Sequence, residues 1–254
     1  MNFLKELLFQ KRIKDLQKKI NAPVRGLHIE GDHSYLATYT ELKKILARRV
    51  DPILSAEGYS YDGAYQWIGP WENDHSRRII KTSLLKGAGV IYMWGRCYDF
   101  IPVISNDGKS YRYQRTDKSA GLQMFPRPTD LHAAPIPEMK GVPKEFSLFG
   151  PDLADVERRT FDAFIETKPL WETWFGLTEG YEAAIAELDR QINYGYSVNW
   201  PAVAYVKAFL LAVHEGPDIG LEALNTYFQD EYYTPPAEDM QDKIRAKLLS
   251  LPKL

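Results

Sequence analysis

Four residues near the N-terminus form the densest group of potential metal ligands in the sequence. The group consists of His28, Glu30, Asp32 and His33. In an extended segment the first three would project from one side, and imidazole with carboxylates suits zinc or a similar divalent ion. However, Gly31 favours a turn here, and no further histidine follows at a spacing typical of zinc sites. We therefore interpret the group as a polar loop and expect no bound metal or other cofactor.

Two other histidines have neighbours that would suit general-base chemistry, because imidazole titrates near neutral pH. His75 follows an Asn-Asp pair, and His132 stands two residues after an aspartate. Both lie in turn-rich or proline-rich segments, and the chain has neither a nucleophile elbow nor a phosphate-binding glycine loop. A metal-dependent hydrolase that uses these loop histidines and the 28–33 group is therefore an alternative function, whereas we expect a protein without enzymatic activity.

Cys97 is the only cysteine of the 254 residues, so no disulfide can form within the chain. A cation beside it, Arg96, could activate the thiol, but most free cysteines behave as small buried hydrophobic residues. Nothing in the chain requires an oxidising compartment, and no stretch approaches the roughly 20 apolar residues of a membrane-spanning helix. We expect a cytoplasmic protein without a transmembrane segment. Helical spacing of apolar residues over 3–20 predicts a terminal amphipathic helix with a basic face, docked on its own domain.

Basic and aromatic residues alternate between positions 77 and 115. The basic residues are Arg77, Arg78, Lys81, Lys86, Arg96, Lys109, Arg112 and Arg115, and the aromatic residues are Tyr92, Trp94, Tyr98, Tyr111 and Tyr113. On a sheet this mixture can bind single-stranded nucleic acid by stacking and phosphate neutralisation. It also describes strands with an apolar face inward and a charged face in water. Because the sequence pI is only 6.2, nucleic-acid binding is a second alternative and not the preferred function.

The net charge of −2 hides a division of charge along the chain. Residues 1–145 hold 23 Lys and Arg against 16 Asp and Glu, a net charge of +7. Residues 146–254 hold 9 against 18, a net charge of −9. Such a division can steer a charged partner to one end of the molecule, or it can make the two parts attract each other.

One acidic segment, residues 229–242, has the composition of a contact surface. Its candidate protein-binding residues are Asp230, Glu231, Tyr232, Tyr233, Glu238 and Asp239. Tyrosine offers rigid contact area with a polar tip, and the acids would attract a basic protein surface. The other interpretation is a loop whose acids favour the N-terminus of the next helix. We predict a non-enzymatic binding protein that engages a basic protein partner.

The apolar spacing predicts an α+β fold. Thr38 and Glu41 have the spacing of a capping box at the start of a helix that Gly58 ends and Pro52 kinks. Runs rich in Tyr, Trp, Ile and Val at 64–68, 77–84, 90–104 and 110–115 predict strands, with Gly95 or Pro102 as an interruption of the third. The sequence Asn106-Asp107-Gly108 predicts a hairpin turn between the last two. Together these features predict an antiparallel meander of about four or five strands.

The remainder of the chain is predicted to be a connector and a helical bundle. Six prolines between 126 and 151 exclude a regular helix or a central strand. Helical spacing then appears at 153–165, 181–192, 203–213, 219–228 and 240–249, with short links that indicate antiparallel neighbours. We therefore expect an α+β domain at 1–145 and an α-helical region at 146–254. The alternative is that the helical region packs with the first domain as one compact unit.

The order of these elements resembles that of small uncharacterised bacterial α+β proteins, some of them immunity proteins of secreted polymorphic toxins. The resemblance covers most of the chain and is one of layout, carried by a helix pair, a C-terminal helical region and the segments Gly58-Tyr59, Tyr65-Gln66-Trp67 and Arg77-Arg78-Ile79. It implies a cytosolic binding protein that blocks a basic toxin by occluding its active site. It carries over no functional residues.

Overall fold

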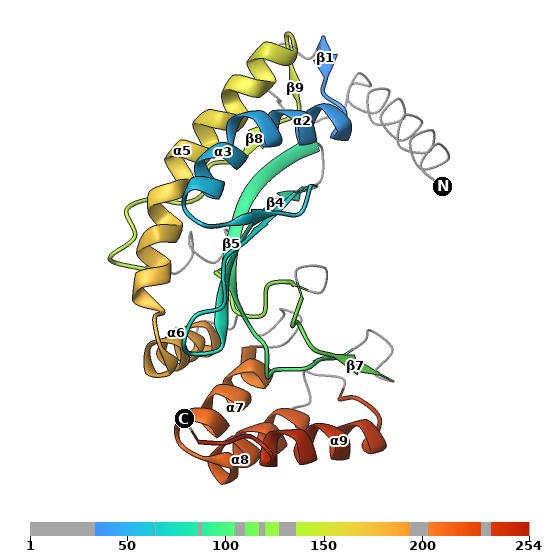
Figure 1. Cartoon of the computed structure of the whole chain (residues 1–254), viewed down its shortest axis with the longest axis vertical. Coiled ribbons are helices and arrows are strands. Elements are labelled where there is room, and N and C mark those ends of the chain that lie inside the picture. Colours follow the sequence, from blue (N-terminus) through green and yellow to red (C-terminus); the bar gives the residue numbers. More distant parts are fainter. Residues whose placement is uncertain are drawn as a thin grey trace, which may run out of the picture.

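The central layer of the α+β fold is a five-stranded antiparallel sheet (Figure 1). The structure, a computed structural model, describes residues 34–63, 65–85, 88–104, 110–116, 120–126, 136–193, 203–229 and 235–253. From edge to edge the strands are β2 (Ser60–Tyr61), β3 (Gln66–Ile68), β4 (Ser76–Leu84), β5 (Gly89–Tyr98) and β8 (Phe146–Ser147). Strands β2 to β5 form a meander, to which β8 adds beside β5. This confirms the predicted α+β class and the antiparallel meander of four or five strands.

The β4–β5 hairpin is the longest part of the sheet and is buried on both faces. Its register runs over nine residue pairs, from Ser76 opposite Tyr98 to Leu84 opposite Val90. Because successive side chains alternate between faces, one face carries the large aromatic residues and the other carries Cys97. Burial raises the pKa of the Cys97 thiol to about 11, so this cysteine stays protonated at neutral pH.

Two short strand pairs flank the sheet. Strand β1 (Tyr35–Leu36) pairs with β9 (Phe149–Gly150), and β6 (Val103–Ile104) pairs with β7 (Tyr111–Arg112). The run predicted over 90–104 is interrupted at the second of its two predicted positions, because the chain turns after Tyr98 and resumes pairing only beyond Pro102. The antiparallel pairing of β6 with β7 is the one predicted for a hairpin, whose turn at 106–108 lies outside the described residues.

Helices α2 (Tyr39–Arg49) and α3 (Asp51–Ala56) begin with the signals seen in the sequence. The Thr38 hydroxyl accepts a hydrogen bond from the Glu41 amide at 3.2 Å, and the Glu41 carboxylate accepts one from the Thr38 amide at 2.7 Å. This is the predicted capping box. Pro52 lies in the first turn of α3, where its missing N–H costs nothing, so the proline starts a second helix after a break at Val50.

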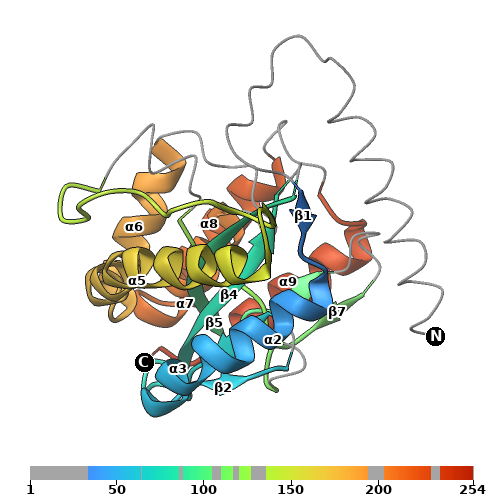
Figure 2. The ribbon, with the colours of Figure 1, turned by 90° about the horizontal axis from the view of Figure 1, so that it is seen from above.

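A long helix, α5 (Leu153–Leu177), covers the sheet beside α2 and α3 (Figure 2). It extends twelve residues beyond the predicted end at residue 165 and contains Pro169. Trp171 packs against Tyr92 and Trp94 of β5, with ring centroids 6.2 and 6.3 Å apart. These aromatic contacts fix α5 on the sheet, because each large ring removes much apolar surface from water.

The C-terminal helices are α6 (Tyr181–Asn193), α7 (Val203–His214), α8 (Pro217–Gln229) and α9 (Glu238–Leu249). Each includes a segment predicted to be helical. Gly216, with φ +136°, ends α7 and lets α8 turn back against it. One continuous buried cluster includes residues from Ala37 to Leu251, so the division at 145/146 stays a prediction. None of the helices in the described part of the chain combines the length and the apolar character needed to cross a membrane.

Candidate interaction site at an acidic corner

The predicted binding segment is only partly visible in the structure. Asp230, Glu231, Tyr232 and Tyr233 lie outside the described residues. Glu238 and Asp239 form the first turn of α9, where carboxylates favour the helix dipole, and Asp239 lies 3.4 Å from the ammonium group of Lys243. That placement agrees with the alternative interpretation of these two residues. Binding of a partner by this segment stays a prediction.

Many other acids of the C-terminal part are neutralised, and most of these lie on α5. Glu157 pairs with Arg48 and Glu166 with Lys144, so some of the positive charge of the first part is spent within the molecule. Ion pairs involve nine of the sixteen described acids beyond residue 145, and Asp152 caps α5. These nine acids are Asp155, Glu157, Asp162, Glu166, Glu172, Glu187, Asp189, Asp239 and Asp242.

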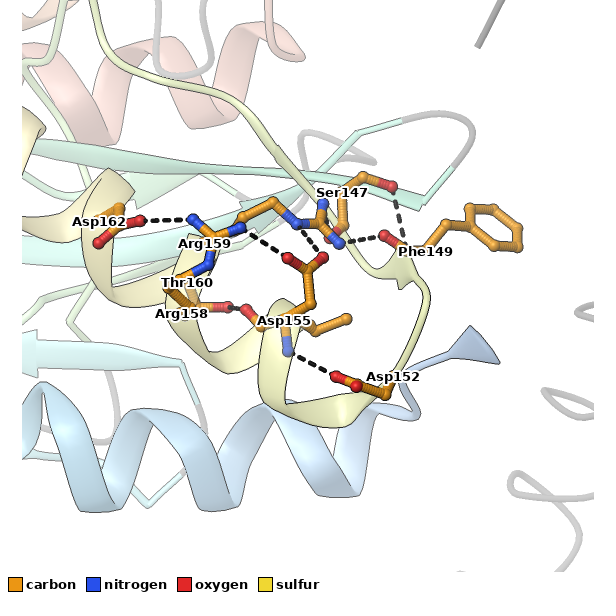
Figure 3. Close-up of polar contacts among 9 residues, drawn as sticks. Ser147, Phe149, Asp152, Asp155, Arg158, Arg159, Thr160 and Asp162 are labelled. Carbon is orange, nitrogen blue, oxygen red and sulfur yellow. Dashed lines mark hydrogen bonds and ion pairs between the residues drawn. The ribbon is translucent and has the colours of Figure 1, made fainter. Parts of the chain in front are cut away.

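Figure 3 shows how completely the start of α5 is neutralised. The Asp155 carboxylate accepts hydrogen bonds from Arg158 at 2.6 Å and from Arg159 at 2.8 Å. Arg159 also donates to the backbone carbonyls of Ser147 and Phe149. The network therefore fastens α5 to the β8–β9 segment, and its charges are engaged in holding the fold.

Six described acids of the C-terminal part form no ion pair and no side-chain hydrogen bond with any other described residue. They are Glu179, Glu182, Glu215, Asp218, Glu222 and Glu238, and all six are exposed. The first five form what we name the acidic corner. None of these five was a predicted site residue.

The pairing of α6 with α7 brings the acidic corner together. The rings of Tyr181, at the start of α6, and His214, at the end of α7, have centroids 6.4 Å apart. Glu179 and Glu182 flank Tyr181, and Glu215 follows His214 directly. Asp218 and Glu222 lie one turn apart on α8 and so share one side of that helix. Figure 1 shows the helices that carry these residues: α5 leads into α6, α7 lies beside α6, and α8 lies beside α7.

A strained turn from the sheet adjoins the acidic corner. It comprises residues 72–76, which we name the His75 turn. His75 has φ +58°, a left-handed conformation that non-glycine residues rarely adopt and that costs about 1 kcal/mol. Its half-exposed imidazole places Nδ1 3.4 Å from the Asp99 carboxylate. Within the turn, the Glu72 amide donates to the Ser76 carbonyl at 2.7 Å.

Tyr181 links the His75 turn to the helices. Its hydroxyl donates to the Asp74 carbonyl at 2.8 Å. Burial, together with the charges of Asp74 and Asp99, raises the pKa of Tyr181, so the hydroxyl remains a neutral donor. The Tyr98 hydroxyl is fully buried and has no hydrogen-bond partner among the described residues. Burial also raises the pKa of Tyr98, and the charge of Asp74 adds to that effect. The Tyr98 hydroxyl is therefore a buried polar group that no described residue uses.

Arg96 holds the other side of the His75 turn. Its guanidinium is completely buried and donates to Glu72 at 2.6 Å, to the Ser76 hydroxyl at 2.9 Å and to the Phe175 carbonyl at 2.9 Å. A fourth bond joins it to Thr178 at 3.2 Å. The turn and the C-terminal end of α5 therefore share one buried cation.

The burial of Arg77 and Arg96 argues against the predicted nucleic-acid platform on the sheet. Arg96 is inside the molecule, Arg77 is 3% exposed beneath the Trp71 ring, and Arg78 pairs with Glu72 at 2.6 Å. The physical reason is that both faces of β4 and β5 are largely covered, so Arg77 and Arg96 reach carbonyl and carboxylate partners inside the molecule. The Arg78 side chain is 37% exposed but is held by Glu72. Lys86 and Lys109 lie outside the described residues, which leaves Arg112 and Arg115 as exposed arginines of the run.

The residues of the predicted hydrolase alternative are not brought together. The 28–33 group and His132 lie outside the described residues. Within the described ranges no three His, Cys, Asp or Glu side chains are placed to hold a metal ion. Among the described residues, the recorded side-chain partner of His75 is Asp99.

The comparisons give no match. Neither a protein-family model, nor a curated protein, nor a solved structure is similar to this chain. The candidate site is therefore identified from the geometry of this chain alone. It is the acidic corner, with the His75 turn beside it.

Proposed function

We propose that this chain is a non-enzymatic, cytosolic protein that binds a basic protein through the acidic corner. One observation carries the proposal: five exposed carboxylates lie at or near the adjoining ends of α6, α7 and α8 with no ion-pair partner among the described residues, while acids of α5 are neutralised. Gathered like charges repel one another and disfavour the compact state. A basic surface docked on the corner would remove that repulsion and supply the missing partners.

The advantage of such a surface lies mainly in speed and specificity. A field of one sign raises the association rate of an oppositely charged protein by about 10- to 1,000-fold, and the gain falls as salt is added. Exposed charges separated by more than about 10 Å are largely screened at 0.1 M ionic strength. Binding through the acidic corner should therefore depend steeply on salt.

The sharpest form of the proposal is a bacterial immunity protein that neutralises a basic toxin. A toxin nuclease needs cations to hold phosphate groups, so its inhibitor gains association rate from carboxylates. The resemblance in layout to bacterial immunity proteins supports this form. A single cysteine, Cys97, buried as a thiol, is compatible with the reducing cytosol in which such an inhibitor acts.

The test compares three variants that remove the same charge from different places. The corner variant carries Glu182→Gln, Glu215→Gln and Asp218→Asn. The matched α5 variant carries Glu166→Gln, Glu172→Gln and Asp162→Asn, whose wild-type acids already form ion pairs. A third variant carries Asp230→Asn, Glu231→Gln and Glu238→Gln in the segment predicted from sequence.

The measured quantity is the association rate with a fluorescent peptide of ten lysine residues, which stands for a basic protein surface, recorded between 0.05 and 0.5 M salt. We expect the corner variant to lose about tenfold in rate at low salt and to show a shallower salt slope, with the α5 variant within about twofold of wild type. If the corner and α5 variants behave alike, the corner is not the binding surface. If only the third variant slows, the surface is the 230–238 segment.

A further inference from the structure

Two exposed leucines and an unpaired acid lie together at the end of the β4–β5 hairpin. Leu84 and Leu85 are 38% and 40% exposed, whereas most large apolar side chains of the sheet are buried. A Cβ atom placed on Gly89 would lie 2.1 Å from Glu145 Oε1 and 3.5 Å from the Cβ atom of Leu85, so this carboxylate lies beside the leucine. Glu145 is exposed and forms no ion pair and no side-chain hydrogen bond with another described residue. We name Leu84, Leu85 and Glu145 the hairpin patch.

The hairpin patch lies close to the point where the N-terminal segment joins the described fold. The Ala37 amide donates to the Leu148 carbonyl at 2.9 Å, and the Leu148 amide donates to the Ala88 carbonyl at 3.0 Å. Extended segments joined in this way lie about 5 Å apart, so Ala37 is about 10 Å from the end of the hairpin. Ser34 precedes Ala37 by three residues. Residues 1–33 are therefore attached near the hairpin patch.

The sequence of that attached segment is complementary to the hairpin patch. The segment lies outside the described residues, but four of its apolar residues would share one side of a helix, namely Phe9, Ile13, Leu16 and Ile20. At 3.6 residues per turn, Arg12 and Lys19 would border this apolar stripe on one flank. Lys11 and Lys18 would lie on the opposite side of the helix. The segment thus offers an apolar stripe for the two leucines and a neighbouring cation for the acid.

The chain between the stripe and the fold is long enough for such a contact. Thirteen residues, 21–33, join Ile20 to Ser34, and an extended chain covers about 3.3 Å per residue, so they span up to about 40 Å. A segment held by a short linker also has an effective concentration in the mM range. Even a weak affinity for the hairpin patch is therefore enough to keep the segment bound.

We propose that residues 9–20 form a helix that docks its apolar stripe on the hairpin patch and pairs Arg12 or Lys19 with Glu145. Docking removes apolar surface of both partners from water, while Lys11 and Lys18 stay in solvent. The hairpin patch lies at the opposite end of the β4–β5 hairpin from the His75 turn. The inference therefore goes beyond the proposed function and does not depend on it.

The test measures how fast cysteine pairs in the full-length chain form a disulfide, because this bond requires the two Cα atoms to approach within about 7 Å. The first pair carries Arg12→Cys and Glu145→Cys, which leaves the stripe and both leucines unchanged. The matched pair carries Lys11→Cys and Glu145→Cys, with nearly the same linker but the thiol on the opposite side of the helix. The native Cys97 is buried and does not compete. We expect the first pair to close at least about tenfold faster than the matched pair.

Two further variants show which surfaces make the contact. Adding Phe9→Ser and Ile13→Ser to the first pair should lower its rate to that of the matched pair, because the apolar stripe is lost. A third pair, Arg12→Cys with Glu215→Cys, tests the acidic corner as the place where the cationic segment binds. We expect this third pair to close as slowly as the matched pair.

Non-reducing electrophoresis separates the outcomes. Equal rates for the first and matched pairs would mean that the segment is not docked on the hairpin patch, and faster closure of the third pair would place it on the acidic corner. Disulfide-linked dimers in place of a closed monomer would identify a second copy of the chain as the occupant. Slow closure of the first pair, with sedimentation of the protein on vesicles of phosphatidylcholine and phosphatidylglycerol, would assign the segment to a membrane surface. Each of these four results overturns the proposal, and none of them depends on a basic partner protein.

Discussion

Arg96 and Glu72 form a buried ion pair in which the two partners differ in solvent access. Arg96 Nη1 lies 2.6 Å from Glu72 Oε2, and the arginine side chain is fully buried whereas the glutamate is 26% exposed. Glu72 also pairs with Arg78 at 2.6 Å, so one carboxylate serves two guanidinium groups. The pair joins the His75 turn to β5 and, through the Phe175 carbonyl, to α5.

This asymmetry predicts that loss of the acid destabilises the protein more than loss of the base. Glu72→Gln leaves a buried guanidinium without its counter-ion, which should cost about 3 kcal/mol in the free energy of unfolding. Arg96→Met removes the buried charge and leaves Glu72 with Arg78, so a smaller loss of about 1 to 2 kcal/mol is expected. Urea unfolding followed by circular dichroism measures both values.

The double variant Glu72→Gln/Arg96→Met provides the control. Because it contains no uncompensated buried cation, it should be more stable than Glu72→Gln alone. Additive losses in the double variant would show that the two side chains stabilise the fold independently.

The parts of this fold that the sequence predicted well are those governed by local interactions. Thr38 and Glu41 lie three residues apart, and a capping box needs nothing beyond that spacing and a following helix. Likewise, the runs rich in Tyr, Trp, Ile and Val predicted strands where β4 and β5 lie, although not the burial of both faces of their hairpin. Such signals act within a few residues, so they can be recognised without knowledge of the tertiary structure.

The longer reach of α5 was missed because a proline normally ends a helix. Pro169 cannot donate to the carbonyl of residue 165, but Ile165 is 48% exposed, so that carbonyl lies on the side of the helix that faces water. Beyond the proline, Trp171 and Trp174 are buried in the core. Their burial outweighs the local cost, and that term depends on the tertiary structure.

The acidic corner could not be predicted because it is defined by missing partners. Glu182 and Glu172 are both exposed glutamates on helices. Glu172 nevertheless pairs with Lys168, whereas Glu182 pairs with no described residue. Which acids are neutralised depends on helix packing and on pairs such as Arg48 with Glu157, 109 residues apart. The count of −9 for residues 146–254 gave the sign of the charge but not its location.

Gly95 is predicted to be essential for the close approach of the 120–126 segment to the sheet. A Cβ atom at this position would overlap the Met124 carbonyl and lie 2.7 Å from the Phe125 side chain. That carbonyl accepts the Arg96 amide hydrogen bond at 2.8 Å, so the segment cannot move away without breaking it. Gly95→Ala should therefore cost about 2 to 3 kcal/mol in the free energy of unfolding.

Gly176 is the matched control for that substitution. It lies in α5, and a Cβ atom there meets nothing within 4 Å. Gly176→Ala should stabilise the protein by about 0.5 to 1 kcal/mol, because alanine favours the helix more than glycine does. Equal losses in the two variants would argue against a steric role for Gly95.

A substitution in the opposite direction, from alanine to glycine, is expected to stabilise the protein at position 88. Its φ of +66° is left-handed, and its carbonyl accepts a hydrogen bond from the Leu148 amide at 3.0 Å, which holds the strained backbone in place. Ala88→Gly should remove the strain and raise the free energy of unfolding by about 0.5 to 1 kcal/mol. Thermal unfolding provides the measurement, and a lower melting temperature would contradict the assigned backbone conformation.

We expect Asp155 to contribute to the pH dependence of the free energy of unfolding. Burial acts to raise its pKa, but hydrogen bonds and charge from Arg158 and Arg159 exceed that effect and hold the pKa below its usual range. A carboxyl group with a lowered pKa in the folded state stabilises the fold above its unfolded pKa, near 4, and this stabilisation is lost as the pH falls through the folded value. The contribution should not exceed about 1 kcal/mol, because the Arg158 side chain of this network is 62% exposed to water.

Urea unfolding between pH 7 and pH 2.5 distinguishes this contribution from the general effect of acid. The free energy of unfolding of Asp155→Asn should be lower than that of wild type at pH 7 and should approach it as the pH falls below the ordinary pKa of aspartate, since the asparagine cannot titrate. Asp162→Asn, which removes a neighbouring acid that bonds Arg158 alone at 3.0 Å, serves as the control and should change the pH profile less. A constant difference between Asp155→Asn and wild type at every pH would mean that the side chain acts by packing and not by charge.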